Sequence, residues 1–186
     1  MEEIENLTGK ILVAQPKNQD RHFGKGVIMI AQHSRSGAWG VIVNHPAKTV
    51  TMRNIMDAAG VEYDGNEQVY VGGPVEPTRV HVIHTLDWVS SSTLKINKDL
   101  GITGDLSVLA AICQGQGPEL YRAGVGLAVW SAGQLDGEMS GLEPWRPENR
   151  WLVAHATPEL CLTGGGEEQW QRSINQCVNN RISDLF

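Results

Sequence analysis

The most concrete catalytic pattern in the sequence surrounds a serine that follows an apolar stretch. Residues 129–133 (VWSAG) approach the nucleophile elbow G-x-S-x-G, although the first glycine is missing. Asp136 and His155 then follow Ser131 in the order Ser, Asp, His. Ser131 and Gln134 equally match the capping box S-x-x-Q, which predicts a helix that starts at the residue after the serine. We prefer the capping role, and a serine hydrolase using Ser131 is the enzyme alternative.

The histidines offer two further arrangements. His81 and His84 form an H-x-x-H, but they fall on a predicted strand, where residues three apart point to opposite faces. They therefore cannot share a metal ion without a bulge, so we predict no metal site and a hydrogen-bonded structural role for His84. His33 and His45 flank a predicted hairpin and could lie close together across it. Polar residues exposed at turns explain this second pair equally well.

The glycine-rich and serine-rich segments lack the partners that cofactor sites need. Residues 124–126 (GVG) lack the third glycine of a dinucleotide fingerprint, and residues 164–166 (GGG) lack the Lys-Ser/Thr of a phosphate-binding loop. Residues 92–95 (STLK) form an S-x-x-K without the accompanying motifs of penicillin-binding enzymes. We predict no cofactor. Gly72, Gly73 and Pro74 indicate a backbone requirement, either close strand packing or a positive φ.

The elements that position these residues are organised around a hairpin over residues 26–46. Two apolar strands, at residues 27–31 and 41–43, are joined by a turn at residues 34–37. Their apolarity is continuous rather than alternating, which predicts that both faces of the strands are covered. The second strand ends at Asn44, His45 and Pro46, because proline lacks the N–H that would extend the pairing.

Further strands and several short helices are expected along the chain. The additional strands are predicted at residues 9–14, 68–71, 78–84, 94–96, 121–130 and 151–156. Helices are predicted at residues 51–59, 105–114, from 132, from Thr157-Pro158, and at 167–178. This mixture predicts one α+β domain over residues 1–186, with a mixed, mainly antiparallel sheet packed with short helices.

Two of these helices show an apolar face from which their packing can be predicted. The helix at residues 105–114 places Leu106, Leu109, Ala110 and Cys113 on one side. The last helix places Trp170, Ile174, Cys177 and Val178 on one side.

Composition and charge restrict the class of partner. Of 186 residues, 41% are apolar and 19% are charged, and the formal net charge of −6 opposes non-specific binding to nucleic acid or anionic membrane. The acidic N-terminus has no signal-peptide core, and no apolar run approaches the roughly 20 residues of a membrane span. Three widely spaced cysteines without a C-x-x-C indicate a reduced, cytoplasmic protein.

An ordered set of landmarks over residues 7 to 175 resembles the YqgE/AlgH family, bacterial proteins of unsettled function often labelled transcriptional regulators. The landmarks are Gly9, Leu12, Val13, Ala14, Pro16, Asp20, Phe23, His33, Gly37, Ala38, Gly40, Asn44, Pro46, Gly72, Gly73, Pro74, Val75, His84, Trp130, Gly133, Gln134, Leu135, Glu138, Asn149, Trp151 and Trp170. The resemblance implies a compact α+β domain with coiled, partly split β-sheets.

The chain also departs from the family pattern at several places. His45 stands where the family usually has Arg or Lys, Val129 replaces a usual Gly, and Ser131 replaces a common Gly. The stretch over residues 139–148 is several residues longer than usual.

The leading interpretation is a non-enzymatic cytoplasmic protein that binds an unidentified protein or small-molecule partner. A role as a transcriptional regulator is implied only by the family label. The residues predicted to bind are polar or glycine-rich and lie where a strand ends or a helix begins, positions at which binding residues concentrate. They are His33, Asn44, His45, Gly72, Gly73, Pro74, Gln134 and Glu138. The prediction requires them to converge on one concave face; otherwise they only cap or turn the chain.

Overall fold

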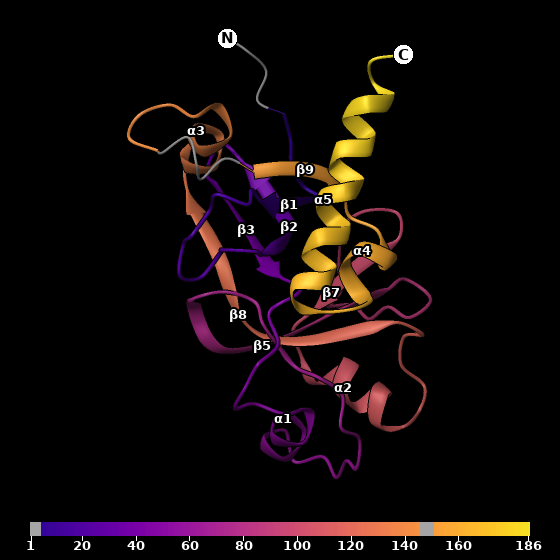
Figure 1. Cartoon of the computed structure of the whole chain (residues 1–186). Coiled ribbons are helices and arrows are strands. Elements are labelled where there is room, and N and C mark those ends of the chain that lie inside the picture. The colour runs from indigo at the N-terminus through magenta and orange to yellow at the C-terminus, as the bar shows by residue number, and fades with distance from the viewer. Residues whose placement is uncertain (1–4, 146–150) are drawn as a thin grey trace.

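The computed structural model describes residues 5–145 and 151–186 as a curved sheet with helices on both sides (Figure 1). The strands are β1 Lys10–Ala14, β2 Val27–Ser34, β3 Gly37–Ile42, β4 Tyr70–Val71, β5 Val75–Thr85, β6 Leu94–Lys95, β7 Leu100–Thr103, β8 Tyr121–Ser131 and β9 Trp151–His155. The helices are α1 Met52–Ala58, α2 Leu106–Cys113, α3 Gln134–Ser140, α4 Pro158–Leu162 and α5 Gly166–Ser183. Residues 146–150, which include the landmark Asn149, lie outside the described residues.

The strand order is β6-β7-β5-β8-β3-β2-β1-β9, with β4 paired to β8. All of these pairings are antiparallel except that of β4 with β8. The long strand β8 joins the two halves of the sheet, because its first part pairs with β5 and its last part, from Ala128 to Ser131, pairs with β3 (Figure 1). The prediction of an α+β fold with a mixed, mainly antiparallel and partly split sheet is confirmed.

Both faces of the central strands are buried, as their continuous apolarity predicts. On one face Val27 and Met29 of β2 pack with residues of α4 and α5. On the other face Ile28 and Ile30 pack with Trp130, Trp151 and other residues near α3. A third apolar cluster joins α1 and α2 to β5 and the first part of β8. The hairpin is thus the middle layer of the molecule.

Two helical faces differ from the sequence-based expectation. Helix α2 buries Val108, Leu109 and Ile112, whereas Leu106 is 60% exposed. Nearly every residue of α2 is apolar, so periodicity alone does not determine which side meets the sheet. Helix α5 extends to Ser183 and buries Ser173 with its tryptophan and cysteine, while Val178 is 44% exposed. The short strand β7 was not predicted from the sequence either, because only two of its four residues are large and apolar.

The Gly-Gly-Pro segment crosses β8 at backbone contact distance. Ideal Cβ atoms built on Gly73 and Gly126 would lie 2.1 Å from the carbonyl oxygen of Leu127 and 2.3 Å from that of Gly73, respectively. Both glycines also have positive φ, 153° and 82°. The amide of Gly72 donates to the carbonyl of Val125 at 2.8 Å. Close strand packing therefore explains this motif.

Within the described residues, no helix is long and apolar enough to cross a bilayer.

Candidate functional site

The start of α3 brings a carboxylate against two buried indoles. Gln134 and Glu138 lie one turn apart on α3, so they share a face of the helix. Glu138 accepts hydrogen bonds from the indole N–H groups of Trp130 and Trp151 at 3.1 and 2.9 Å, and from the Gln134 amide at 3.1 Å. Trp130 is the last residue but one of β8 and Trp151 is the first of β9, so Glu138 links α3 to both strands.

Beside this carboxylate lies a pocket of about 170 Å³, here called the aromatic–acidic pocket. It is lined by Asn18, Asp20, Phe23, Val129, Trp130, Gln134, Glu138 and Trp151. The Phe23 ring stacks on Trp130 at a centroid distance of 6.2 Å and meets Trp151 edge-on at 6.0 Å. The pocket therefore combines two carboxylates, two side-chain amides and three aromatic rings.

A short polar loop positions the near wall of the pocket. The amide oxygen of Asn18 accepts from the Asp20 N–H at 2.9 Å. One carboxylate oxygen of Asp20 accepts from the N–H groups of His22 and Phe23, at 2.8 and 3.0 Å. Side chains that bond backbone groups two or three residues on are typical of Asx turns. These turns hold the Phe23 ring against the tryptophans.

Ser131 is neither a helix cap nor part of a catalytic triad in this structure. The N-cap of α3 is Gly133, with φ of 74°, so the predicted capping role of Ser131 and the predicted helix start are wrong. The Ser131 hydroxyl and N–H both donate to the Gln134 side-chain oxygen, at 3.2 and 3.0 Å. Gln134 thus supplies its half of the capping box, but the glycine with positive φ delays the helix by two residues.

The other proposed triad members contact other residues than the serine. Asp136 pairs with Nε2 of His33 at 3.1 Å, and the ring of His155 lies 3.4 Å from the amine of Lys10. Within residues 5–145 and 151–186, Ser131 therefore has no histidine as a hydrogen-bond partner. A serine nucleophile requires such a base to take its proton.

His33 is buried and both of its ring nitrogens are engaged. Its Nδ1 accepts the N–H of Leu7 at 3.1 Å, which leaves the proton on Nε2 to be donated to Asp136. These contacts tie β2 to the N-terminal segment and to α3. Since Nδ1 is occupied by a backbone donor, His33 is not free to act as a base.

Asn44 is completely buried and its amide is fully used. Its oxygen accepts the N–H of Val27 at 2.7 Å, and its nitrogen donates to the carbonyls of Lys25 and Gly166 at 2.9 and 3.0 Å. Asn44 thereby joins the start of β2 to the start of α5. Burial lowers the pKa of the neighbouring His45, although hydrogen bonds to the nearby backbone act in the opposite direction.

The predicted binding residues form two groups rather than one face. Three of them gather at α3, namely His33, Gln134 and Glu138. The others, Asn44, His45, Gly72, Gly73 and Pro74, lie where β3 ends and β2 begins. Asn44 bonds Val27 at one end of β2, and His33 lies near the other end, roughly 20 Å along the strand. Gly73 packs against the backbone of Leu127 and Ala128 of β8. The predicted residues therefore do not gather on one concave face. Only Gln134 and Glu138 line the aromatic–acidic pocket.

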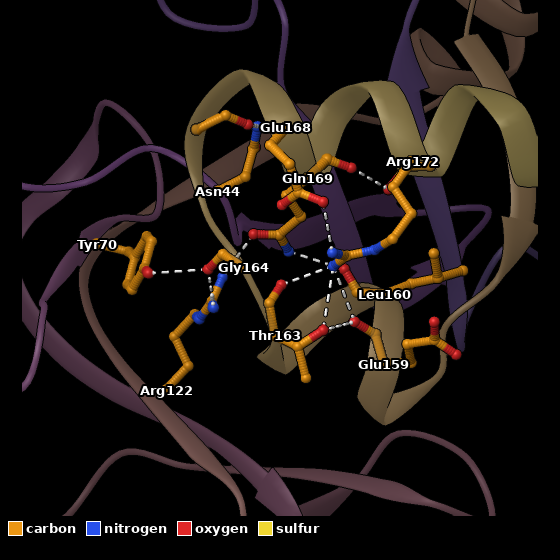
Figure 2. Close-up of polar contacts among 12 residues, drawn as sticks. Asn44, Tyr70, Arg122, Glu159, Leu160, Thr163, Gly164, Glu168, Gln169 and Arg172 are labelled. Atoms are coloured by element: carbon orange, nitrogen blue, oxygen red, sulfur yellow. Dashed lines mark hydrogen bonds and ion pairs between the residues drawn. The ribbon is translucent and has the colours of Figure 1, made fainter.

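A buried arginine that sequence reasoning did not single out fixes the loop before α5 (Figure 2). Arg122 of β8 donates to the Gln169 side chain at 2.8 Å, to the carbonyl of Gly164 at 2.7 Å, and to that of Val43. Its guanidinium lies 4.0 Å from the centroid of the Tyr70 ring, and burial lowers its pKa. In the sequence, Arg122 is a single charged residue within an otherwise apolar strand, and this pattern could have identified it as a buried structural residue.

The H-x-x-H histidines occupy separate environments, as strand geometry predicts. Nε2 of His81 lies 3.0 Å from the Gly126 carbonyl, and burial lowers the pKa of His81 to about 4. His84 lies between the carbonyl of Thr85, at 2.9 Å from Nδ1, and the hydroxyl of Thr103, at 2.8 Å from Nε2. The expected structural, hydrogen-bonded role of His84 is confirmed.

Comparison with known proteins places this geometry in a family. The AlgH-like family model matches residues 11–180. A UPF0301 protein of Xylella fastidiosa (strain M23) is 36% identical over 174 residues, covering 91% of this chain and 88% of its own length. A UPF0301 protein of Rhodospirillum rubrum is 36% identical over 173 residues, covering 91% and 86%.

Solved structures of similar proteins share this fold. The solution structure of the AlgH protein from Pseudomonas aeruginosa superposes with a TM-score of 0.74 at 27% identity, covering 94% of this chain and 90% of that one. A crystal structure of a Corynebacterium diphtheriae protein, at 24% identity and a TM-score of 0.71, shares the fold. Because the family model and the relatives each span most of the sequence, the chain belongs to the AlgH-like family.

Proposed function

We propose that the protein acts in the bacterial cytoplasm by binding a ligand or protein partner at the aromatic–acidic pocket, and not by catalysis. One observation carries this proposal. Six of the eight residues that line the pocket are landmarks of the family resemblance: Asp20, Phe23, Trp130, Gln134, Glu138 and Trp151. They come from three separate stretches of the chain and meet at this pocket.

A regulatory role would operate through the occupant of this pocket. The family label of transcriptional regulator and the overall charge of −6 are compatible only if DNA is contacted indirectly or in a sequence-specific way. A protein that senses a ligand or binds a partner protein would be consistent with both the regulator label and the negative net charge.

The hydrolase alternative gains no support from the geometry. The Ser131 hydroxyl is exposed and donates to the Gln134 amide oxygen, which cannot accept a proton as a base does. His33, the histidine that contacts Asp136, accepts a backbone N–H on its other nitrogen.

Affinity capture with matched variants tests the binding proposal. The wild-type protein, Glu138→Gln and Asp20→Asn serve as baits in native cell lysate, with Glu62→Gln and Asp64→Asn as controls that remove the same charge at exposed positions. Bound proteins and small molecules are identified by mass spectrometry. We expect one captured species to be shared by the wild type and the controls and lost from both pocket variants.

The result is interpretable only for folded baits, so each variant is first checked by thermal melting. Glu138→Gln alters a carboxylate that accepts hydrogen bonds from both indoles, so this variant could lose stability. Asp20 is exposed and does not bond the indoles, so Asp20→Asn tests the pocket without that change. Capture of the same species by all five baits would contradict the proposal.

A further inference from the structure

Within residues 5–145 and 151–186, the aromatic–acidic pocket has two carboxylates and no cation paired with either of them. Asp20 and Glu138 both line it. Among the described residues, neither carboxylate forms an ion pair with a lysine, an arginine or a histidine. Two carboxylates that share a small cavity repel each other, and a cation placed between them relieves that repulsion.

The remaining walls suit an organic cation rather than a hydrated metal ion. The rings of Phe23, Trp130 and Trp151 line the same pocket, and the electron-rich face of an aromatic ring attracts ammonium and guanidinium groups. The two tryptophans are almost completely buried, so the part of each ring that borders the pocket is shielded from water. A planar, weakly hydrated guanidinium loses less on entering such a site than a compact ammonium.

One buried amide in the pocket has an unused donor. Asn18 is 4% exposed, and its side-chain oxygen accepts the Asp20 N–H, which fixes the orientation of the amide. No described residue accepts a hydrogen bond from its side-chain nitrogen, although Asn18 lines the pocket. Among the described residues this nitrogen is not one of the fully buried atoms that lack a partner, so it is open to the pocket, where an unpaired donor favours a ligand with an acceptor. The ligand should therefore carry an oxygen acceptor beside its cation.

We propose that the pocket binds the guanidinium or ammonium end of a basic amino acid, with Asp20 and Glu138 facing the cation and Asn18 donating to a carbonyl or carboxyl oxygen. This inference rests on the proposed function, because it concerns the same pocket. At about 170 Å³ the pocket lies below the range of drug-sized ligands, so it takes one side chain. That side chain belongs either to a free amino acid or to a residue presented by a partner protein.

Nuclear magnetic resonance and calorimetry with four probes test the chemistry. The probes are Nα-acetyl-arginine amide, its neutral isostere Nα-acetyl-citrulline amide, the anionic Nα-acetyl-glutamate amide, and free arginine. We expect the arginine probes to shift the indole N–H signals of Trp130 and Trp151. The citrulline probe should bind about tenfold more weakly or worse, because it lacks the charge.

Variants locate the contribution of each group. Asp20→Asn should weaken the arginine probes about tenfold, whereas Asp64→Asn should leave their affinity unchanged. Asn18→Ala should weaken Nα-acetyl-arginine amide more than it weakens propylguanidine, which has no oxygen acceptor. Preference for free arginine would indicate a small-molecule ligand, and preference for the blocked residue would indicate a side chain of a partner protein.

Three results would overturn the inference: equal affinity for the citrulline and arginine probes, tighter binding of the glutamate probe, or no shift of either indole with any cation. These failures differ from failure of the proposed function. If lysate capture still depends on Glu138 and Asp20, the pocket is the binding site but its ligand is not a basic group. If arginine binds but capture ignores these residues, the pocket holds cations without recruiting the partner.

Discussion

At the scale of single residues, buried polar side chains whose hydrogen-bonding atoms all have partners differ from Asn18, which has a donor open to a pocket. His33 and Asn44 are buried, and each ring or amide nitrogen and oxygen of these two has a partner. Such closed arrangements hold elements together and leave nothing to offer a ligand. Among the described residues, none accepts a hydrogen bond from the side-chain nitrogen of Asn18, so the aromatic–acidic pocket offers a donor to a ligand.

His81 makes folding stability depend on pH. Burial lowers its pKa in the folded protein to about 4, against an ordinary value of 6.5. The unfolded chain therefore takes up a proton first as the pH falls, so stability is complete above pH 6.5 and declines toward pH 4. We expect His81 alone to remove about 2 kcal/mol between pH 7 and pH 5, measured by urea unfolding.

His81→Gln is the control for this titration, because its amide can still donate to the Gly126 carbonyl. The variant should show a smaller loss between the two pH values than the wild type. Burial also lowers the pKa of His45 and of His84, so some loss remains in the variant. Equal losses in both proteins would mean that His81 titrates normally in the folded state.

Ser131 should be dispensable for both folding and chemistry. It is exposed and its hydroxyl contacts only Gln134 among the described residues, so Ser131→Ala should change the free energy of unfolding by less than about 0.5 kcal/mol. A fluorophosphonate probe should leave the wild-type protein unlabelled, as judged by intact mass. Labelling that is absent from Ser131→Ala would restore the hydrolase alternative.

At the scale of elements, sequence patterns predict the strands of the central hairpin well, because continuous apolar runs between turn residues are unambiguous. They fail where the choice depends on a neighbour. The buried side of α2 is one such case, since both of its candidate faces are apolar. The start of α3 is a second case, because Gly133 adopts a positive φ that the local sequence pattern does not predict.

The crossing of the Gly-Gly-Pro segment over β8 should tolerate no side chain. In Gly126→Ala the new Cβ would lie 2.3 Å from the Gly73 carbonyl oxygen, at a φ of 82°. Overpacking and backbone strain together should cost about 3 kcal/mol or more, measured by denaturant unfolding. Gly60→Ala is the matched control, because Gly60 has a φ of 73° and open space around it.

The control should lose only the backbone strain, about 1–2 kcal/mol. If the two variants lose the same stability, the steric contact at the crossing is relieved by movement of the segment. The close approach would then not be the reason for these glycines.

At the scale of the whole molecule, the site depends on contacts that the sequence does not reveal. The pocket is assembled from residues 18–23, 129–138 and 151, which come together only when β8 and β9 reach the same side of the sheet. Gln134 and Glu138 could be predicted from the sequence because they follow a strand, whereas Asn18 could not. The sequence-based prediction also grouped Gln134 and Glu138 with Asn44 in one site. The fold instead places Asn44 at the other end of β2.

The overall charge also bears on the partner. With a formal net charge of −6, the protein should repel nucleic acid and attract cationic ligands. In an electrophoretic mobility assay at physiological salt, random duplex DNA should remain unbound at about 1 µM protein. Tight binding to random duplex would contradict the charge argument, and binding to one sequence alone would support direct regulation.

The most direct test of binding at the aromatic–acidic pocket is the NMR spectrum of the six indole N–H groups in a sample labelled with ¹⁵N at tryptophan. Signals are assigned with single Trp→Phe variants, and unlabelled native lysate is added to the folded protein. If the pocket is the recognition site, the signals of Trp130 and Trp151 shift or broaden, because both indoles donate to the carboxylate beside the ligand. The same addition should leave these two signals unchanged in Asp20→Asn. Unmoved signals of Trp130 and Trp151 in the wild type, while the capture experiment still yields a partner, would contradict the account.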